Sequence, residues 1–185
     1  MRKNKKTLHI SDITKSALCI AFLCVASYMV IPLPFTPVVL SMHTVAVNLT
    51  GLILSPENAV AVIVIYLLMG MAGLPVFAGG TGFSKLFGPT GGFYFGFLIT
   101  VFIISILKGK EINLKKYIII TIAVGIPVQH LCAVLFMCIY SGCDVLTAFI
   151  NVSAPFIAGD ILKCIVASVC AVRINKALVK NVIKK

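Results

Sequence analysis

Apolar residues follow one another in long runs along most of this chain, separated by short segments rich in proline, glycine or charge. A helix that crosses a bilayer needs roughly 20 consecutive, mostly apolar residues. Divided by that length, the pattern predicts an all-α membrane protein forming one domain over residues 1–185. Its six transmembrane helices are expected at about 14–31, 38–54, 56–72, 92–107, 117–139 and 155–174.

Helix-breaking and helix-starting residues mark the limits of these runs. The segment IPLPFTP (31–37) ends the first run, because its prolines cannot continue a helix. Ser55 suits an N-cap and Pro56 the first helical position, and residues 153–155 offer the same signal for the last helix. Residues 144–152 predict a short helix lying near the membrane surface.

Composition and charge agree with a membrane protein. The chain is 60% hydrophobic and 11% charged, less than half the charge usual in a soluble domain. With six helices, fourteen of the sixteen basic residues fall on one side, which the positive-inside rule makes cytoplasmic, together with both termini. This clustering argues against nucleic acid as a partner. The three groups are Arg2, Lys3, Lys5, Lys6 and Lys15; Lys108, Lys110, Lys115 and Lys116; and Arg173, Lys176, Lys180, Lys184 and Lys185.

One acid and one base remain inside the last predicted helix. Asp160 and Lys163 are three residues apart, so they lie on one helical face. Ionisable groups at membrane depth are costly and face the bundle interior, where they mark a binding site or form an ion pair that only fixes helix packing. Asn151 and Gln129 could add polar groups to a site, although Gln129 could instead join two helices by a hydrogen bond.

A glycine-rich segment, GLPVFAGGTGFSKLFGPTGG (73–92), lies between the third and fourth predicted helices. Glycines allow close backbone approach to a ligand and let successive N–H groups point at an anion. Its apolar residues distinguish it from a solvated linker. We expect it to cap the external end of the bundle, the alternative being a passive loop.

No standard catalytic or metal-binding motif is present. The motifs HExxH, GxSxG and GxxxxGKS/T are all absent, and His9, His43 and His130 are isolated in the sequence. We therefore expect no catalytic residue, metal or cofactor. An ATP-driven process would need its ATPase on another chain.

Four segments together resemble the BioY family, the biotin-specific substrate-capture (S) components of energy-coupling-factor (ECF) vitamin transporters. They are IPLPFTPVVLS, GLPVFAGG, LFGPTGG and APFIAGDILK, in this order along most of the chain. The resemblance implies a six-helix S-component fold in the bacterial cell membrane and a biotin site near the external face. It also implies a membrane coupling subunit and two cytoplasmic ATPases as partners. Ala17 and Ala21 are similar to the small-residue motif by which such components dock on the coupling subunit.

The residues singled out above suit biotin chemically. Asp160 can accept from the ureido N–H groups, and Lys163, Asn151 or Gln129 can donate to the ureido carbonyl. The segment Gly79–Gly80–Thr81 and Lys85 could hold the valerate carboxylate. Phe77, Phe87 and Tyr94 could supply the apolar lining.

Other functions stay open at this point. The chain could capture another small vitamin, or be a membrane enzyme that uses Asp160 with His130 or His43. It could also be a structural bundle or channel without a ligand. Biotin binding by the purified protein would separate these classes.

Overall fold

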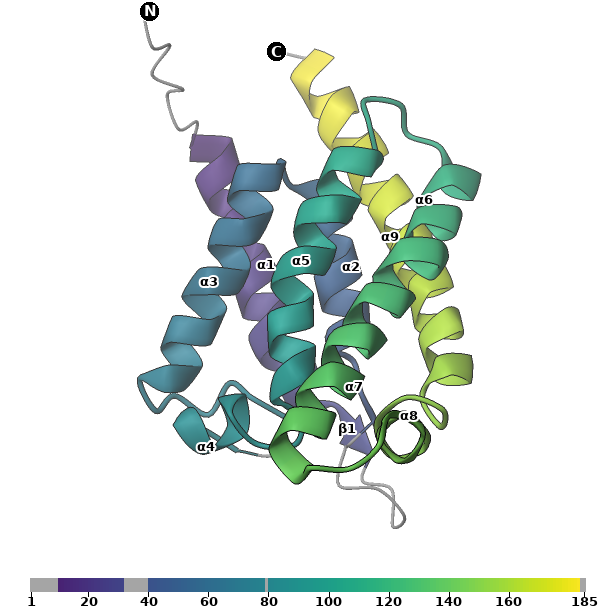
Figure 1. Cartoon of the computed structure of the whole chain (residues 1–185). Helices are drawn as coiled ribbons and strands as arrows, with labels where there is room; N and C mark the ends of the chain where they lie inside the picture. Colours follow the sequence, from purple (N-terminus) through teal and green to yellow (C-terminus); the bar gives the residue numbers. More distant parts are fainter. Residues whose placement is uncertain (1–9, 32–39, 79, 184–185) are drawn as a thin grey trace, which may run out of the picture.

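The structure, a computed structural model, describes residues 10–31, 40–78 and 80–183. Among the described residues the regular elements are helices apart from one pair of two-residue strands, and the long helices stand side by side as a bundle (Figure 1). Its elements are α1 (Ile10–Tyr28), β1 (Val30–Ile31), β2 (Leu40–Ser41), α2 (His43–Ile53), α3 (Pro56–Met71), α4 (Phe83–Leu86), α5 (Gly91–Leu107), α6 (Leu114–Ile120), the π-helical turn η1 (Thr121–Gly125), α7 (Ile126–Ser141), α8 (Val145–Val152) and α9 (Ile157–Ile183).

The helices differ in how well their length suits a bilayer. Among the described residues, α1 and the continuous helix Leu114–Ser141 are long and apolar enough to cross a membrane. The pair α8 and α9 makes a third candidate, bent by 54° between the two helices. The helices α2, α3 and α5 are apolar but contain only 11, 16 and 17 residues.

The first two predicted helices are wrong at their facing ends. The first was expected to reach residue 31, but α1 ends at Tyr28 and Val30–Ile31 pairs antiparallel with Leu40–Ser41. The second was expected from residue 38, but α2 begins only at His43. Strand pairing satisfies the backbone groups here, so the apolar character of these residues did not indicate a helix. The prolines of the IPLPFTP segment lie outside the described residues.

The last helix is displaced and longer than predicted. Residues 153–156 form a turn, so α9 starts at Ile157 rather than at Pro155, and it continues to Ile183 instead of ending near residue 174. The bilayer limits only the apolar part of a helix, and neither glycine nor proline stops this one. The short helix predicted at 144–152 is confirmed as α8, capped by the Asp144 side chain, which accepts from the Thr147 N–H at 3.2 Å.

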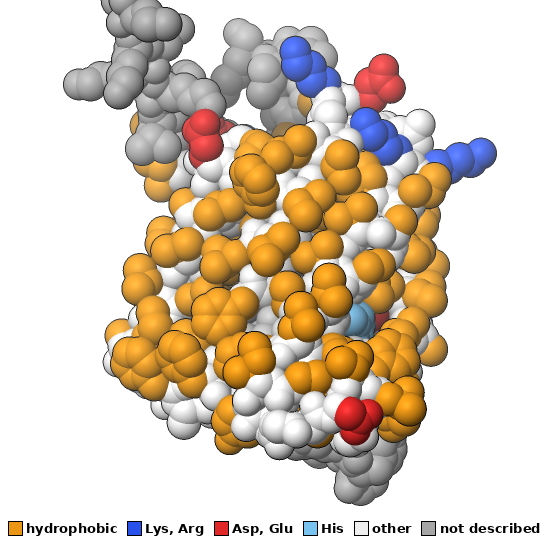
Figure 2. Space-filling model, viewed as in Figure 1, with side chains coloured by type: hydrophobic (Ala, Val, Ile, Leu, Met, Phe, Trp, Pro, Cys, Tyr) orange, Lys and Arg blue, Asp and Glu red, His pale blue; other side chains and the backbone are white. Residues whose placement is uncertain are grey.

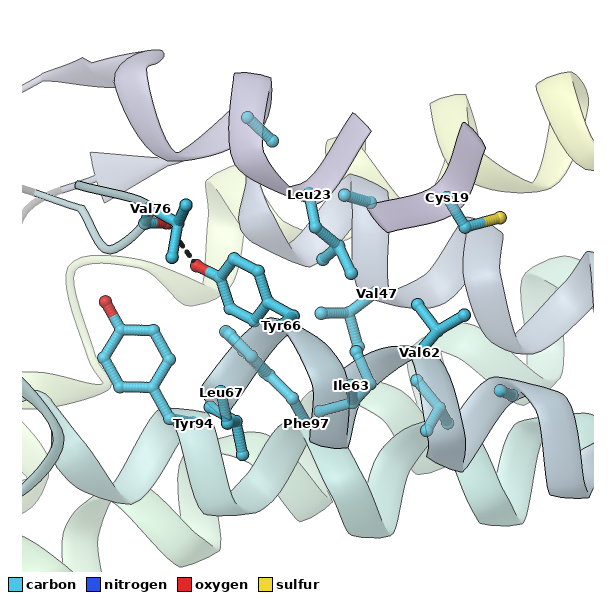
Figure 3. Close-up of a cluster of buried hydrophobic side chains, with 14 of the residues drawn as sticks. Cys19, Leu23, Val47, Val62, Ile63, Tyr66, Leu67, Val76, Tyr94 and Phe97 are labelled. Carbon is cyan, nitrogen blue, oxygen red and sulfur yellow. Dashed lines mark hydrogen bonds between the residues drawn. The ribbon is translucent and has the colours of Figure 1, made fainter. Parts of the chain in front are cut away.

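Two kinds of packing share the interior. The helices α1, α3 and α5 enclose an apolar core, part of which Figure 3 shows. It contains an aromatic cluster, which consists of Tyr66, Phe77, Tyr94 and Phe97. The helices α2 and α9 and the turn η1 instead meet along a polar seam of small side chains, consisting of Thr44, Asn48, Thr121, Cys164 and Ser168.

The seam runs lengthwise because its α9 residues repeat every four positions. Asn48 Nδ2 donates to Cys164 Sγ at 3.3 Å, and the Cys164 thiol lies 3.5 Å from the Thr121 carbonyl oxygen. One turn further along α9, Ser168 Oγ is 3.2 Å from Thr121 Oγ1. At Gly125, the last residue of η1, an added Cβ would lie 2.8 Å from Asn48 Oδ1. Glycine there lets α2 approach the turn closely.

The glycine-rich segment folds over the end of the bundle that also carries α8. Phe77 lies against Gly70 of α3 so closely that a Cβ at Gly70 would be 2.1–2.5 Å from three atoms of the Phe77 ring. Val76, Phe77 and Leu86 are buried, as expected of a cap, whereas Leu74, Phe83 and Phe87 are exposed. Gly73 and Gly82 have φ angles of +94° and +75°, a conformation that favours glycine.

The start of α1, the connection from α5 to α6 and the end of α9 lie at the opposite end of the bundle (Figure 1). Figure 2 shows apolar side chains over the middle of one face and Lys and Arg side chains at that same end. The described basic residues Lys15, Lys108–Lys116 and Arg173–Lys180 belong to these segments.

Candidate functional site

The Asp160 carboxylate lies in the first turn of α9 and receives three side-chain hydrogen bonds. Lys163 Nζ donates to Oδ1 at 2.9 Å, and Thr44 Oγ1 of α2 donates to the same oxygen at 3.1 Å. His130 Nε2 of α7 lies 3.1 Å from Oδ2. Asp160 is only 5% exposed, so these donors replace water around a buried charge. The predicted pairing of Asp160 with Lys163 is confirmed.

A pocket opens beside this carboxylate, at the end of the bundle covered by the glycine-rich segment. The space between its walls amounts to about 480 Å³ when the open solvent at its mouth is included, and only about 50 Å³ of it admits the centre of a water-sized molecule. Its walls come from the starts of α2, α5 and α9 and from the covering segment. They consist of Ser41, His43, Thr44, Ala78, Thr90, Phe93, Tyr94, Phe97, Phe156, Asp160 and Lys163.

Aromatic rings form the apolar wall of the pocket. Tyr94 and Phe97 contact each other edge to face, with ring centroids 5.6 Å apart, and both contact the His43 ring. The Tyr94 hydroxyl accepts a hydrogen bond from the Ala78 N–H at 3.2 Å, which fastens the covering segment to α5. The pocket therefore has an aromatic side and a charged side that face one cavity.

A chain of hydrogen bonds leads from the pocket wall into the covering segment. Ser41 Oγ lies 3.1 Å from His43 Nδ1, and His43 Nε2 lies 2.7 Å from the Tyr66 hydroxyl. That hydroxyl donates to the Val76 carbonyl oxygen at 2.7 Å, the bond drawn as a dashed line in Figure 3. His43 and Tyr66 are buried, so the inner part of this series of bonds is shielded from water.

Three of the residues that the sequence proposed for the site line the pocket: Asp160, Lys163 and Tyr94. Phe77 is buried behind Tyr94, with ring centroids 4.6 Å apart. Gln129 is buried, and the Nε2 of its side chain has no hydrogen-bond partner among the described residues. Asn151 is half-buried in α8, outside the pocket wall.

The predicted anion-binding loop lies beside the pocket rather than in its wall. Lys85 folds its aliphatic stem over Gly80, where an added Cβ would lie 2.7 Å from Lys85 Cε. Thr81 is exposed, and the exposed Phe87 does not line the pocket. Gly79 lies outside the described residues.

Sequence reasoning did not propose Ser41 or Thr44, and it treated His43 and His130 as isolated. Thr44 and His130 are 116 and 30 residues from Asp160 in the chain, and they reach it only because α2 and α7 pack beside α9. The usable signal was the presence of polar residues within otherwise apolar helices. That signal does not say which of them meet.

The comparisons with known proteins identify the family to which this sequence belongs. The sequence model described as the BioY family matches residues 1–180. The chain belongs to the BioY family. Its resemblance to that family in sequence motifs is thereby confirmed over nearly its whole length.

Curated BioY relatives align along most of their own length. A biotin transporter BioY of Thermotoga maritima is 30% identical over 92% of this chain and 99% of the relative. Biotin transporter BioY2 of Lactococcus lactis subsp. cremoris is 34% identical over 90% of this chain and 91% of the relative. A probable biotin transporter BioY of Pyrococcus horikoshii is 35% identical over 75% of this chain and 82% of the relative.

A solved structure has the same fold. The crystal structure of the S-component for biotin from an ECF-type ABC transporter superposes with a TM-score of 0.81, at 26% identity and covering 95% of each chain. The helical bundle of this chain is therefore the BioY S-component fold.

Proposed function

We propose that this chain is the biotin-capturing subunit of an ECF-type vitamin uptake transporter, and a transport subunit rather than an enzyme. The observation that carries the proposal is the buried Asp160–Lys163 pair, 2.9 Å apart, in the wall of the pocket of a BioY-family protein. The relatives and the matching crystal structure, all named for biotin, support the choice of ligand.

The ureido ring of biotin has two N–H donors and one carbonyl acceptor. Asp160 supplies acceptor oxygens and Lys163 a charged donor within one turn of α9, so both kinds of ureido contact are available side by side. The rings of Tyr94 and Phe97 suit the apolar thioether ring. The valerate chain then extends toward Gly80, Thr81 and Lys85, whose ammonium group offers a charge partner for the carboxylate. Asn151 and Gln129 stay candidate donors from beside the pocket.

Calorimetric titration of the purified, detergent-solubilised chain with biotin tests this function. We expect tight one-to-one binding of biotin and much weaker binding of thiamine and riboflavin, which lack a ureido ring with two N–H donors. Tight binding of another vitamin would make the chain an S component of different specificity. Absence of binding to any of these compounds would contradict capture altogether.

We propose six membrane spans, formed by α1, α2, α3, α5, the helix Leu114–Ser141 and α9, with both termini in the cytoplasm. The support is that the basic segments gather at one end of the bundle and the pocket lies at the other. The glycine-rich segment and α8 are then external. Labelling of Lys110→Cys, in a background without the native cysteines, checks this. An impermeant thiol reagent added outside should fail to react, and reaction would contradict the topology.

We propose that α1 docks on the membrane coupling subunit, which works with two cytoplasmic ATPases. Ala17 and Ala21 are both exposed and one turn apart, so a partner helix can approach closely at this point. Ala17→Trp or Ala21→Trp should abolish ATP-driven biotin uptake and leave biotin affinity unchanged, because neither residue lies near the pocket. Normal uptake with both tryptophans would place the docking surface elsewhere.

A further inference from the structure

The hydrogen-bond chain behind the pocket wall has one arrangement of protons that satisfies it. The Val76 carbonyl oxygen can only accept, so the single hydroxyl proton of Tyr66 is committed to it at 2.7 Å. The close contact between Tyr66 and His43 Nε2 then requires Nε2 to carry the proton. Tyr66 thereby fixes the orientation and the tautomer of a histidine that lines the pocket.

The tautomer of His43 also determines the hydrogen-bond role of Ser41. The His43 ring is 2% exposed and enclosed by aromatic rings, surroundings in which the neutral form is favoured. With the proton on Nε2, Nδ1 is an acceptor, and the Ser41 hydroxyl donates its own proton to it at 3.1 Å. The lone pairs of Ser41 Oγ are then left for whatever occupies the pocket.

We infer that Ser41 accepts one ureido N–H of the ligand while Asp160 accepts the other, and that Tyr66 and His43 are the positioning residues that make Ser41 an acceptor. This inference rests on the proposed biotin site and adds a residue to it. Ser41 and Asp160 stand on different walls, on β2 and α9, of the same pocket. The pocket thus offers two separate acceptors and the Lys163 donor, which matches the two donors and one acceptor of a ureido group.

The hydrogen bonds from Ser41 through His43 and Tyr66 to Val76 also connect the pocket to the glycine-rich segment. Tyr66 donates a hydrogen bond to Val76, the residue before Phe77, and the Phe77 ring packs against Gly70. The Tyr94 hydroxyl accepts from the Ala78 N–H. A change at Tyr66 therefore alters the Ser41 contact and the seating of the cap together. To separate these two effects, a second tyrosine with a bond to the same segment is needed.

Tyr28 supplies that control. Its hydroxyl donates to the Pro75 carbonyl oxygen at 2.6 Å, one residue before Val76. Among the described residues it forms no hydrogen bond with His43, and it does not line the pocket. We expect Tyr66→Phe to weaken biotin binding about tenfold, because two buried polar groups lose their partner, and Tyr28→Phe to change it less than twofold. Equal losses in both variants would mean that the tyrosines only anchor the segment, and would overturn the inference.

The Ser41 contact is tested with ligands that lack one donor. Two cyclic carbamate analogues of biotin, each with oxygen in place of a different ureido N–H, are titrated against the wild type and Ser41→Ala. Ser41→Ala should weaken biotin about fivefold to tenfold, yet bind one of the two analogues within twofold of the wild type. An equal loss for biotin and both analogues would show that Ser41 does not receive an N–H, and would overturn the inference.

Nitrogen-15 NMR of labelled histidines gives a readout that simple destabilisation does not mimic. The His43 signal, assigned by its loss in His43→Gln, should have the pattern of a neutral ring protonated on Nε2. A ring protonated on Nδ1 would contradict the proton assignment, because Ser41 could then not donate to it. If Asp160→Asn abolishes binding while Ser41→Ala and Tyr66→Phe bind as the wild type does, the inference fails and the proposed function stands. A wild-type protein that does not bind biotin would overturn both.

Discussion

The aromatic cluster and the polar seam solve the same packing problem in opposite ways. Within lipid there is no hydrophobic drive between helices, so association depends on close contact. The aromatic cluster achieves it by shape, with the Phe77 ring seated against Gly70 and flanked by Tyr66 and Tyr94. The seam achieves it with small side chains, which let α2 and α9 approach and form hydrogen bonds.

The pocket lies where these two regions meet. Tyr94 and Phe97 belong to the aromatic cluster, whereas Thr44 belongs to the seam and Asp160 begins the polar face of α9. A ligand there contacts apolar rings on one side and buried donors and acceptors on the other. The proposed site therefore combines the chemistry of both regions at their junction, and each region can be perturbed separately.

The largest expected effect is at the junction itself. Asp160→Asn and Lys163→Met should each lower biotin affinity by roughly 2–5 kcal/mol, because each leaves a buried partner without its counter-charge. Calorimetric titration measures the change. Lys176→Met, at an exposed position of the same helix, is the matched control and should bind normally. Binding within a few-fold of the wild type in both pair variants would make the pair purely structural.

The aromatic cluster should be sensitive to volume. Gly70→Ala should destabilise the protein by about 1–3 kcal/mol, because the new Cβ overlaps the Phe77 ring and the core is already filled. Thermal unfolding in detergent reports the loss. Adding Phe77→Leu to Gly70→Ala should recover part of it, since the smaller side chain leaves room beside residue 70 for the new Cβ. Additive losses in the double variant would show that the two residues do not share one space.

A smaller effect is expected at the edge of the cap. Gly80→Val should weaken biotin binding a few-fold without unfolding the bundle, because the new side chain displaces the stem of Lys85, a flexible neighbour. Titration together with an unfolding curve separates the two quantities. Wild-type affinity would mean that this part of the segment takes no part in enclosing the ligand.

The smallest effect is expected within the seam. Ser168→Ala removes two hydrogen bonds, one donated to the Cys164 carbonyl oxygen within α9 and one shared with Thr121 Oγ1 of η1. A bond of the second kind, between membrane helices, averages about 0.6 kcal/mol. Stability should fall by about that amount, and biotin affinity should stay unchanged because Ser168 does not line the pocket. A much larger loss would show that the seam bonds act as a cooperative unit.

The sequence predicted the helical membrane architecture because apolar runs of about 20 residues match the length of a helix that crosses a bilayer. It also predicted the Asp160–Lys163 pair, whose partners lie one turn apart. It did not predict that Thr44 and His130 complete the surroundings of Asp160, since those contacts join helices far apart in sequence. The strand pair at Val30–Ser41 was missed for a related reason, because its pairing is decided across an intervening segment.

The π-helical turn η1 acts as a phase shift in the longest apolar run. Each residue of an α-helix advances the side-chain direction by about 100°, so the additional residue of a π turn rotates everything after it by that angle. Tyr117 precedes the π turn and Thr121 begins it, and both contact α9, while His130 follows the turn and still reaches Asp160. Pro127, which lacks an N–H, stands just where such a change of bonding is tolerated. In an uninterrupted α-helix, residues 121 and 130 would point in nearly opposite directions. If Thr121 pointed into the seam, His130 would then point toward lipid instead of toward Asp160.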